Sequence, residues 1–253
     1  MKIVAFIPAR LESKRFPNKV LKLIDGLPMI EHVRRRALLS NAFDKVYIVT
    51  NSLIIKKKLK KFNPKIIITK KRHTNGTSRV SEISKKHKFD YATILFADEP
   101  FINPIHLKNI VNKIPKNKKI SIFNVTTNIK YRDMNSPEVV KTIVDKNGNI
   151  RDYFRLSKKK LFKKMLIKKS SGILIIKDNL IKNYKFLKIK NKEKIYKIEQ
   201  FRFLENSLKI KSIFIKDIYP SVNTKKELKD LLCSVRNDKK EIKLKNKIKN
   251  FEY

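Results

Sequence analysis

The sequence predicts an α/β protein with a Rossmann-like, mostly parallel β-sheet flanked by helices. Apolar runs of strand length alternate with amphipathic helical stretches over about the first hundred residues. Alternation at this spacing favours right-handed β-α-β crossovers, which place successive strands in parallel. Ligands of such sheets bind beyond the carboxyl ends of the strands. We therefore expect the polar clusters that follow the first and fourth apolar runs to face one crevice.

The first half of the chain carries the clearest elements. Residues 2–8 form a continuous apolar run, as is typical of a buried parallel strand. Apolar residues at helical spacing predict a helix over residues 28–40, with three successive arginines largely on its other side. The other elements expected here are strands over 45–50, 65–69 and 91–96 and helices over 52–62 and 77–87.

The second half is less regular. We expect strands over residues 119–125, 139–144, 171–176 and 211–216 and helices over 193–208 and 225–235. Asn147-Gly148 predicts a hairpin turn, and Thr224 is expected to cap the last helix. These elements predict a single domain over residues 1–236, followed by a lysine-rich C-terminal tail over residues 237–253 that is expected to fray.

The charge of the chain raises the hypothesis of a polyanion- or nucleic-acid-binding protein. It has 63 basic and 22 acidic residues and a formal net charge of +41, and such a field attracts phosphates. The excess is nearly all lysine, however, and it accompanies abundant isoleucine and asparagine, which A/T-rich codons specify. The lysines are spread along the chain without the interleaved aromatic residues that stack on bases. Compositional drift is thus the favoured explanation, attraction of an anionic substrate is another, and no nucleic-acid partner is expected.

The lengths of the apolar runs and the number of cysteines indicate where the protein is located and whether it can form a disulfide. The apolar run at the N-terminus is too short for a secretory signal, and no run approaches the roughly 18 apolar residues of a membrane span. We therefore expect a cytoplasmic protein without a membrane partner. Cys233 is the single cysteine, which excludes an intramolecular disulfide, and we expect it to be a small buried residue.

Three cationic side chains follow the first strand. Residues 7–19 place Arg10, Arg15 and Lys19 on a loop at the ligand edge of the sheet. A nucleoside triphosphate carries about four negative charges and needs several fixed cations, with arginine binding in a bidentate manner and lysine as a point charge. The loop is neither a Walker A motif nor a GxGxxG turn, so an ordinary basic loop in a basic protein is the alternative.

Two further clusters carry candidate chemistry. Asp98-Glu99 follows the fourth strand, and an acidic pair there suits a divalent metal that bridges phosphates; alternatively, Asp98 caps the next helix. The segment from His73 to Arg79 is a turn that leads into a helix, and backbone groups around Gly76 could bind a base. An ordinary capped turn explains this segment as well, and His73 alone is typical of a surface or capping histidine.

More segments extend this ordered set along the chain. They are Asp25–Val33, Ser136-Pro137-Glu138-Val139-Val140-Lys141, Ile198-Glu199-Gln200-Phe201-Arg202 and Val222-Asn223-Thr224. The whole set resembles the 3-deoxy-manno-octulosonate (Kdo) cytidylyltransferases, the enzymes that make CMP-Kdo for lipopolysaccharide. The resemblance spans about residues 1–235. Related cytidylyltransferases share the opening block, whereas the combination of segments is far more specific to this family.

The resemblance implies a fold of the nucleotide-diphospho-sugar transferase type, with a small β-rich part that forms a homodimer. It implies transfer of a cytidylyl group from CTP to Kdo by attack of the anomeric hydroxyl on the α-phosphorus, with Mg²⁺ as cofactor. Catalysis would consist mainly of positioning and neutralisation of phosphate charge. The residues implied for CTP are Arg10, Arg15, Lys19, His73, Gly76, Thr77 and Arg79; for Mg²⁺, Asp98 and Asn223; for the sugar, Lys141, Glu199 and Gln200; and for catalysis, Arg10, Lys19 and Asp98.

Several positions depart from the family pattern. Where the family has a second metal-binding aspartate this chain has Asn223, whose neutral amide can still coordinate a metal but lowers the affinity. The other departures are Phe96 for a glutamine, Ser170 for a histidine, Ser78 for an acidic residue and Asn51 for an aspartate. Three interpretations follow: a Kdo enzyme with drifted positions, a relative acting on another 3-deoxy sugar acid, or a protein with little activity.

Overall fold

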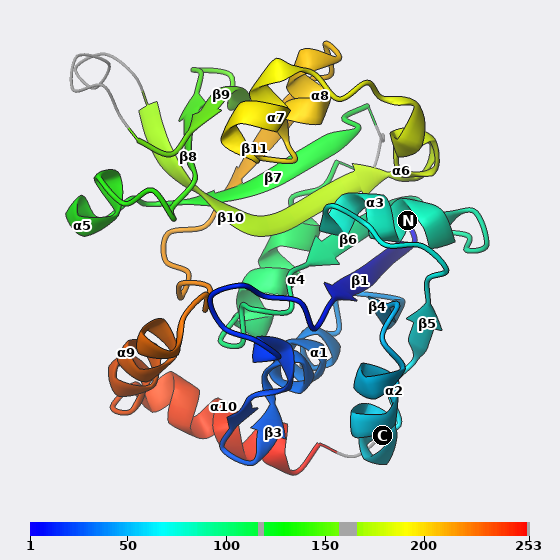
Figure 1. Ribbon diagram of the computed structural model, residues 1–253. Coiled ribbons are helices and arrows are strands. Elements are labelled where there is room, and N and C mark those ends of the chain that lie inside the picture. Colours follow the sequence, from blue (N-terminus) through cyan, green and yellow to red (C-terminus); the bar gives the residue numbers. More distant parts are fainter. Residues whose placement is uncertain (116–118, 157–165, 252–253) are drawn as a thin grey trace.

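The computed structural model describes residues 1–115, 119–156 and 166–251, and Figure 1 shows their arrangement. Within these residues nine strands form one mixed sheet in the order β5-β4-β1-β6-β10-β7-β11-β9-β8. The strands are β1 (Ile3–Ala9), β4 (Lys45–Thr50), β5 (Ile66–Ile68), β6 (Tyr91–Leu95), β7 (Ile122–Thr127), β8 (Lys141–Val144), β9 (Asn149–Phe154), β10 (Leu166–Lys177) and β11 (Ile210–Phe214). The two-residue strands β2 (Leu23–Ile24) and β3 (Leu27–Pro28) form a separate hairpin.

The helices connect these strands and cover the sheet. They are α1 (Met29–Leu39), α2 (Leu53–Leu59), α3 (Gly76–Ser84), α4 (Pro104–Asn112), α5 (Tyr131–Met134), α6 (Asp178–Asn183), α7 (Asn191–Tyr196), α8 (Phe201–Glu205), α9 (Lys225–Val235) and α10 (Lys239–Lys249). None of the helices in the described part of the chain is long and apolar enough to cross a membrane.

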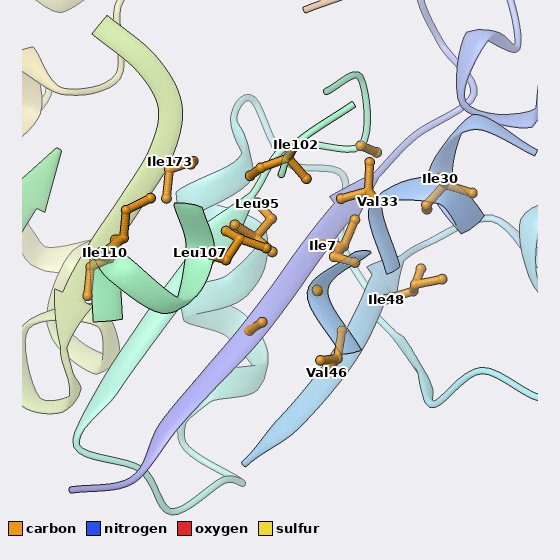
Figure 2. Packing of buried hydrophobic residues seen from close by; sticks show 14 of the residues in the cluster. Ile7, Ile30, Val33, Val46, Ile48, Leu95, Ile102, Leu107, Ile110 and Ile173 are labelled. Atoms are coloured by element: carbon orange, nitrogen blue, oxygen red, sulfur yellow. The ribbon is translucent and has the colours of Figure 1, made fainter. Parts of the chain in front are cut away.

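The first half of the sheet is parallel, as the sequence predicts. Strand β1 lies between β4 and β6, β4 pairs with β5, and all three pairings are parallel. All seven residues of β1 are buried, because helices cover both faces of the sheet there. In Figure 2, Ile7, Ile48 and Leu95 of three neighbouring strands pack with Val33 of α1 and Leu107 of α4. This core fixes the strand ends from which the site loops emerge.

The prediction of a mostly parallel sheet is wrong for the second half, where only β7 and β11 pair in parallel. Strand β10 runs antiparallel to β6, β7 and β8, and β9 runs antiparallel to β8 and β11. The extra β10–β8 pairing closes β10, β7, β11, β9 and β8 into a five-strand ring. The register of β10 with β7 shifts between Ser170 and Leu174, and the polar residues before this bulge belong to the strand. Only the apolar end of β10 was expected, so its role as a bridge between both halves was not visible in the sequence.

Two other helical predictions differ from the structure. The single helix expected over residues 193–208 is two short helices, α7 and α8, because Lys197 has a φ of 52° and ends α7 in the left-handed region. The segment from Asn237 does not fray over the described residues: it forms α10, in which Ile248 is buried and Glu241 pairs with Arg36 of α1. Cys233 is exposed on α9, contrary to expectation.

The last part of the chain packs back on its beginning. Figure 1 shows α9 and α10, in orange and red, beside the blue segment that holds β3 and α1. A small apolar cluster joins α9 to the loop after β1, with Phe16, Phe101, Val222 and Leu231 among its buried members. The N-terminus of α9 is fixed by a capping box between Thr224 and Glu227, as predicted for Thr224. The residues just before α9 are thereby held against the site.

Candidate active site

A large cleft lies at the carboxyl ends of the parallel strands. It is lined by the loops after β1 and β6, the start of α3, the bulge of β10, the α7–α8 junction and the segment before α9. Its volume of about 2140 Å³ exceeds the roughly 300–1,000 Å³ of common small-ligand pockets, so two substrates can fit. The expectation that the polar clusters after β1 and β6 face one crevice is confirmed.

The loop after β1 brings its three predicted cations to this cleft. Arg10, Arg15 and Lys19 all line it. Phe16 is buried in the α9 cluster and anchors the middle of the loop. Arg15 forms an ion pair with Glu138, and both side chains are about half exposed, so a bound anion can compete for the guanidinium. The geometry provides a cationic wall for a polyphosphate.

Lys19 is held between the two predicted metal ligands. Its Nζ lies 2.6 Å from Asp98 Oδ2 and 3.2 Å from Asn223 Oδ1, and it also donates to the carbonyl oxygen of Val222 at 3.0 Å. The Val222 N–H donates to the carbonyl oxygen of Asp98 at 2.8 Å, so the two loops are joined through their backbones. Helix α4 is capped by Asn103, which excludes the alternative role of Asp98 as its N-cap.

The Asp98–Asn223 pair has the chemistry of a magnesium site. Both oxygens converge on one cation, and a carboxylate with an amide oxygen is a donor set that Mg²⁺ accepts. Among the residues that the structure describes, no group of three or more His, Cys, Asp or Glu side chains could hold a metal ion. Mg²⁺ commonly uses one or two protein oxygens and takes its remaining ligands from water and phosphate. The pair therefore fits a metal that is held jointly with a nucleotide.

The turn before α3 forms a second wall. Gly76 lines the cleft, and an added Cβ there would lie 2.9 Å from the Phe96 ring and 3.0 Å from Pro8, so only glycine allows this close approach. Asn75 caps α3 by accepting the Ser78 N–H at 2.8 Å. Thr77 is fully buried beneath the turn and does not line the cleft.

Two more residues predicted for this wall have fixed partners. Arg79 lines the cleft and donates through Nη1 to Asn51 Oδ1 at 2.9 Å and to Thr69 Oγ1 at 2.8 Å. Burial lowers the pKa of Arg79 from its usual value. His73 also lines the cleft, and its Nε2 lies 2.7 Å from Glu82 Oε2. Both side chains are thus held by partners within the protein.

The residues predicted for the sugar separate into two groups. Glu199 and Gln200 line the cleft at the α7–α8 junction. Glu199 accepts the Thr77 N–H at 3.2 Å, its other carboxylate oxygen has no hydrogen-bond partner, and burial raises its pKa to about 7. Lys141 is instead fully buried behind the cleft wall, where its ammonium donates to the carbonyl oxygens of Ser136 and Arg155.

Arg155 is a cleft residue that sequence reasoning missed. It follows β9, a strand that was not predicted, and its Nη1 donates to the carbonyl oxygens of Pro137 and Glu138 at 3.0 and 3.1 Å. Burial lowers its pKa, although the guanidinium stays charged at neutral pH. It adds a cation on the side of the cleft formed by the five-strand ring.

The floor of the cleft brings Phe96 and Glu99 against Gly172, a packing that was not predicted from the sequence, where Glu99 was expected with Asp98 as an acidic pair for a metal. An added Cβ at Gly172 would lie 2.5 Å from Glu99 Oε1 and 2.7 Å from the Phe96 ring, so this glycine is required by close packing. The Gly172 N–H donates to Glu99 at 2.8 Å. Burial and the neighbouring charge of Asp98 raise the pKa of Glu99 to about 7. Nearby, the Ser170 hydroxyl donates to the buried Asn124 at 2.7 Å. The floor therefore combines the apolar side chain of Phe96 with the hydrogen bonds of Glu99 and Ser170.

Comparison with known proteins shows the family to which this chain belongs. A family model described as cytidylyltransferase matches residues 4–212. The 3-deoxy-manno-octulosonate cytidylyltransferase of Elusimicrobium minutum (strain Pei191) is 31% identical over 242 residues, which cover 93% of this chain and 98% of the relative. The chain belongs to the Kdo cytidylyltransferase family. The family predicted from the sequence is confirmed, and with it a nucleotidyltransferase.

Another relative and two solved structures are also similar to this chain. The 8-amino-3,8-dideoxy-manno-octulosonate cytidylyltransferase of Shewanella pealeana (strain ATCC 700345 / ANG-SQ1) is 30% identical over 246 residues, covering 93% of this chain and 98% of the relative. A solved CMP:2-keto-3-deoxy-manno-octonic acid synthetase complexed with CTP has a TM-score of 0.86 at 26% identity, covering 94% of this chain and 100% of that chain. The inositol-1-phosphate CTP transferase from T. maritima shares the fold, with a TM-score of 0.65 at 10% identity, covering 93% of this chain and 96% of that chain.

Proposed function

We propose that the protein transfers a cytidylyl group from CTP to Kdo, giving CMP-Kdo and pyrophosphate for lipopolysaccharide synthesis. The observation that carries this proposal is the cleft, which is lined by the cationic loop, by the Asp98–Asn223 oxygen pair and by Glu199 and Gln200. The names of the Elusimicrobium relative and of the CTP-bound synthetase support the two substrates.

The nucleotide half of the site acts through charge. Arg10, Arg15 and Lys19 would bind the triphosphate and spread its charge over three cations. Gly76 would let the nucleotide approach the backbone at the start of α3, where Asn75 and Arg79 are already fixed by hydrogen bonds. Mg²⁺, when bound at the Asp98–Asn223 pair, supplies further neutralisation of the phosphates.

The sugar half of the site acts through orientation. Glu199 and Gln200 would bind hydroxyl groups of the sugar, and Arg155 offers a guanidinium for its carboxylate. The anomeric hydroxyl would attack the α-phosphorus in line with the departing pyrophosphate. A P–O bond to the sugar forms, the bond from the α-phosphorus to the bridging oxygen breaks, and pyrophosphate leaves with that oxygen while the hydroxyl proton passes to the pyrophosphate or to solvent. Alignment of the two substrates would provide much of the rate enhancement. Lys141 would act only from behind the wall, by holding the carbonyl of Arg155 in place.

Another 3-deoxy sugar acid is the second candidate substrate. The Shewanella relative is named for an 8-amino sugar and is nearly as similar as the Kdo-named relatives. Pyrophosphate release should be measured with CTP and each of the two sugar acids in parallel, with reactions that lack the protein or the sugar acid as controls. Release with Kdo supports the proposal, whereas release with the 8-amino sugar alone selects the second candidate.

The assembly and setting of the enzyme are also proposed. A homodimer through the five-strand ring is supported by exposed apolar side chains on its strands and on the segments that connect them. Tyr131 of α5, Leu156 after β9 and Leu166 of β10 are 91%, 66% and 53% exposed. We place the enzyme in the cytoplasm, where its nucleotide substrate would be.

A polyanion- or nucleic-acid-binding protein is the alternative from another functional class. It predicts binding to duplex nucleic acid that weakens steeply as the salt concentration rises. If the protein loses this binding near physiological salt and still binds CTP, the alternative is excluded.

A further inference from the structure

Lys19 occupies the point on which the two candidate metal ligands converge. Its ammonium donates to Asp98 Oδ2 at 2.6 Å and to Asn223 Oδ1 at 3.2 Å. The side chains of Lys19 and Asp98 are only 15% and 22% exposed, so water screens this pair weakly. A divalent cation entering here would share one carboxylate with an ammonium group.

The charges of this cluster balance without a metal. Asp98 contributes −1, Lys19 contributes +1, and Asn223 and the carbonyl of Val222 are neutral. An aspartate at position 223 would leave one negative charge over for a metal, whereas the amide leaves none. With asparagine at position 223, the Lys19 ammonium thus neutralises the one carboxylate among the three groups to which it donates.

We propose that Lys19 is a built-in counterion that excludes divalent metal from the Asp98–Asn223 pair until a nucleoside triphosphate draws its ammonium away. The triphosphate offers Lys19 several anionic oxygens and offers the metal its missing ligands. Metal and nucleotide therefore bind with positive coupling, and each raises the affinity for the other by the same factor. This inference rests on the proposed function, because it takes that oxygen pair as the metal site.

Mn²⁺ binding to the protein alone tests the exclusion, with free Mn²⁺ counted by electron paramagnetic resonance. Lys19→Met removes the competing ammonium and keeps most of the side-chain volume. An opposite charge in close contact commonly shifts an ionisation equilibrium by 10- to 1,000-fold, so we expect Lys19→Met to bind Mn²⁺ at least about tenfold more tightly than wild type. Lys14→Met removes the same charge from the exposed part of the same loop and should change the affinity less than about twofold.

Two further arms locate the site and test the coupling. Adding Asp98→Asn to Lys19→Met should abolish the gained Mn²⁺ binding, which assigns it to the Asp98–Asn223 pair. Wild-type protein should bind Mn²⁺ more tightly with a non-hydrolysable CTP analogue than without it, after subtraction of the Mn²⁺ bound by the analogue itself. This comparison needs no variant, so it holds even if Lys19→Met folds poorly.

The proposal is overturned if Lys19→Met binds Mn²⁺ no more tightly than Lys14→Met, or if wild type binds Mn²⁺ equally well with and without the analogue. None of these measurements uses a sugar acid or requires turnover. A protein that fails to release pyrophosphate with Kdo can therefore still pass this test, and an active enzyme can fail it, so the two proposals fail separately.

Discussion

The buried ion pair between α1 and α10 should decide whether the C-terminal helix is part of the folded unit. Arg36 Nη2 lies 2.6 Å and Nη1 3.2 Å from the two carboxylate oxygens of Glu241. The side chains are 2% and 4% exposed, and Arg36 Nε has no hydrogen-bond partner. Glu241 is thus the counter-charge for a guanidinium that packs over the ring of Phe101.

Glu241→Gln keeps the shape of this contact and removes its charge. Leaving one partner of a buried pair uncompensated costs about 3–5 kcal/mol. For a chain of this size each kcal/mol lowers Tm by about 2–4 °C, so the variant should melt roughly 6–20 °C below wild type. Urea unfolding should show a lower midpoint with an unchanged slope, because the surface exposed on unfolding stays the same.

Two controls separate the buried charge from the helix itself. Lys243→Gln changes an exposed residue of the same helix and should stay within about 0.5 kcal/mol of wild type. The double variant Arg36→Met with Glu241→Leu replaces both charges with apolar groups and should recover most of the loss. A cost below about 1 kcal/mol for Glu241→Gln would show that α10 does not depend on this pair.

Three further variants test the site. Because burial raises the pKa of Glu199 to about 7 from 4.5, the folded protein holds a proton that the unfolded chain releases, and stability falls as pH rises through that window. Glu199→Gln removes this titration, so its Tm relative to wild type should rise between pH 5 and pH 8; parallel profiles would refute the assignment. Asp98→Asn should abolish metal-dependent turnover while Tm changes little, and unchanged turnover would count against the metal role. Asn223→Asp should lower the Mg²⁺ concentration for half-maximal rate, and an equal or higher concentration would place residue 223 away from the metal.

The parallel half of the fold was predictable because its strands are buried on both faces. Such strands are continuous apolar runs, and residues 45–50 were predicted with the observed bounds of β4. Strand β9 was missed because only Ile150 and Tyr153 are buried and charged residues lie between them. The break between α7 and α8 was missed because the residue in the left-handed region is Lys197. Glycine or asparagine at this position would have predicted a turn, whereas lysine rarely adopts this conformation.

The site was predictable where a loop directly follows a predicted strand. Arg10 and Asp98 follow β1 and β6, and strand topology alone brings them to one cleft. The contact of Lys19 with Asn223 joins residues 204 positions apart, and no local pattern encodes it. The burial of Lys141 depends on the closed ring of strands, which the predicted parallel sheet does not contain.

Pyrophosphate release from CTP is the direct test of cytidylyl transfer to Kdo. The purified protein should be assayed with CTP and Kdo, each alone and both together, with and without Mg²⁺. Release is expected only when CTP, Kdo and Mg²⁺ are all present. Absence of release under that condition, in a protein that still binds CTP, would contradict the assignment of Kdo as the acceptor.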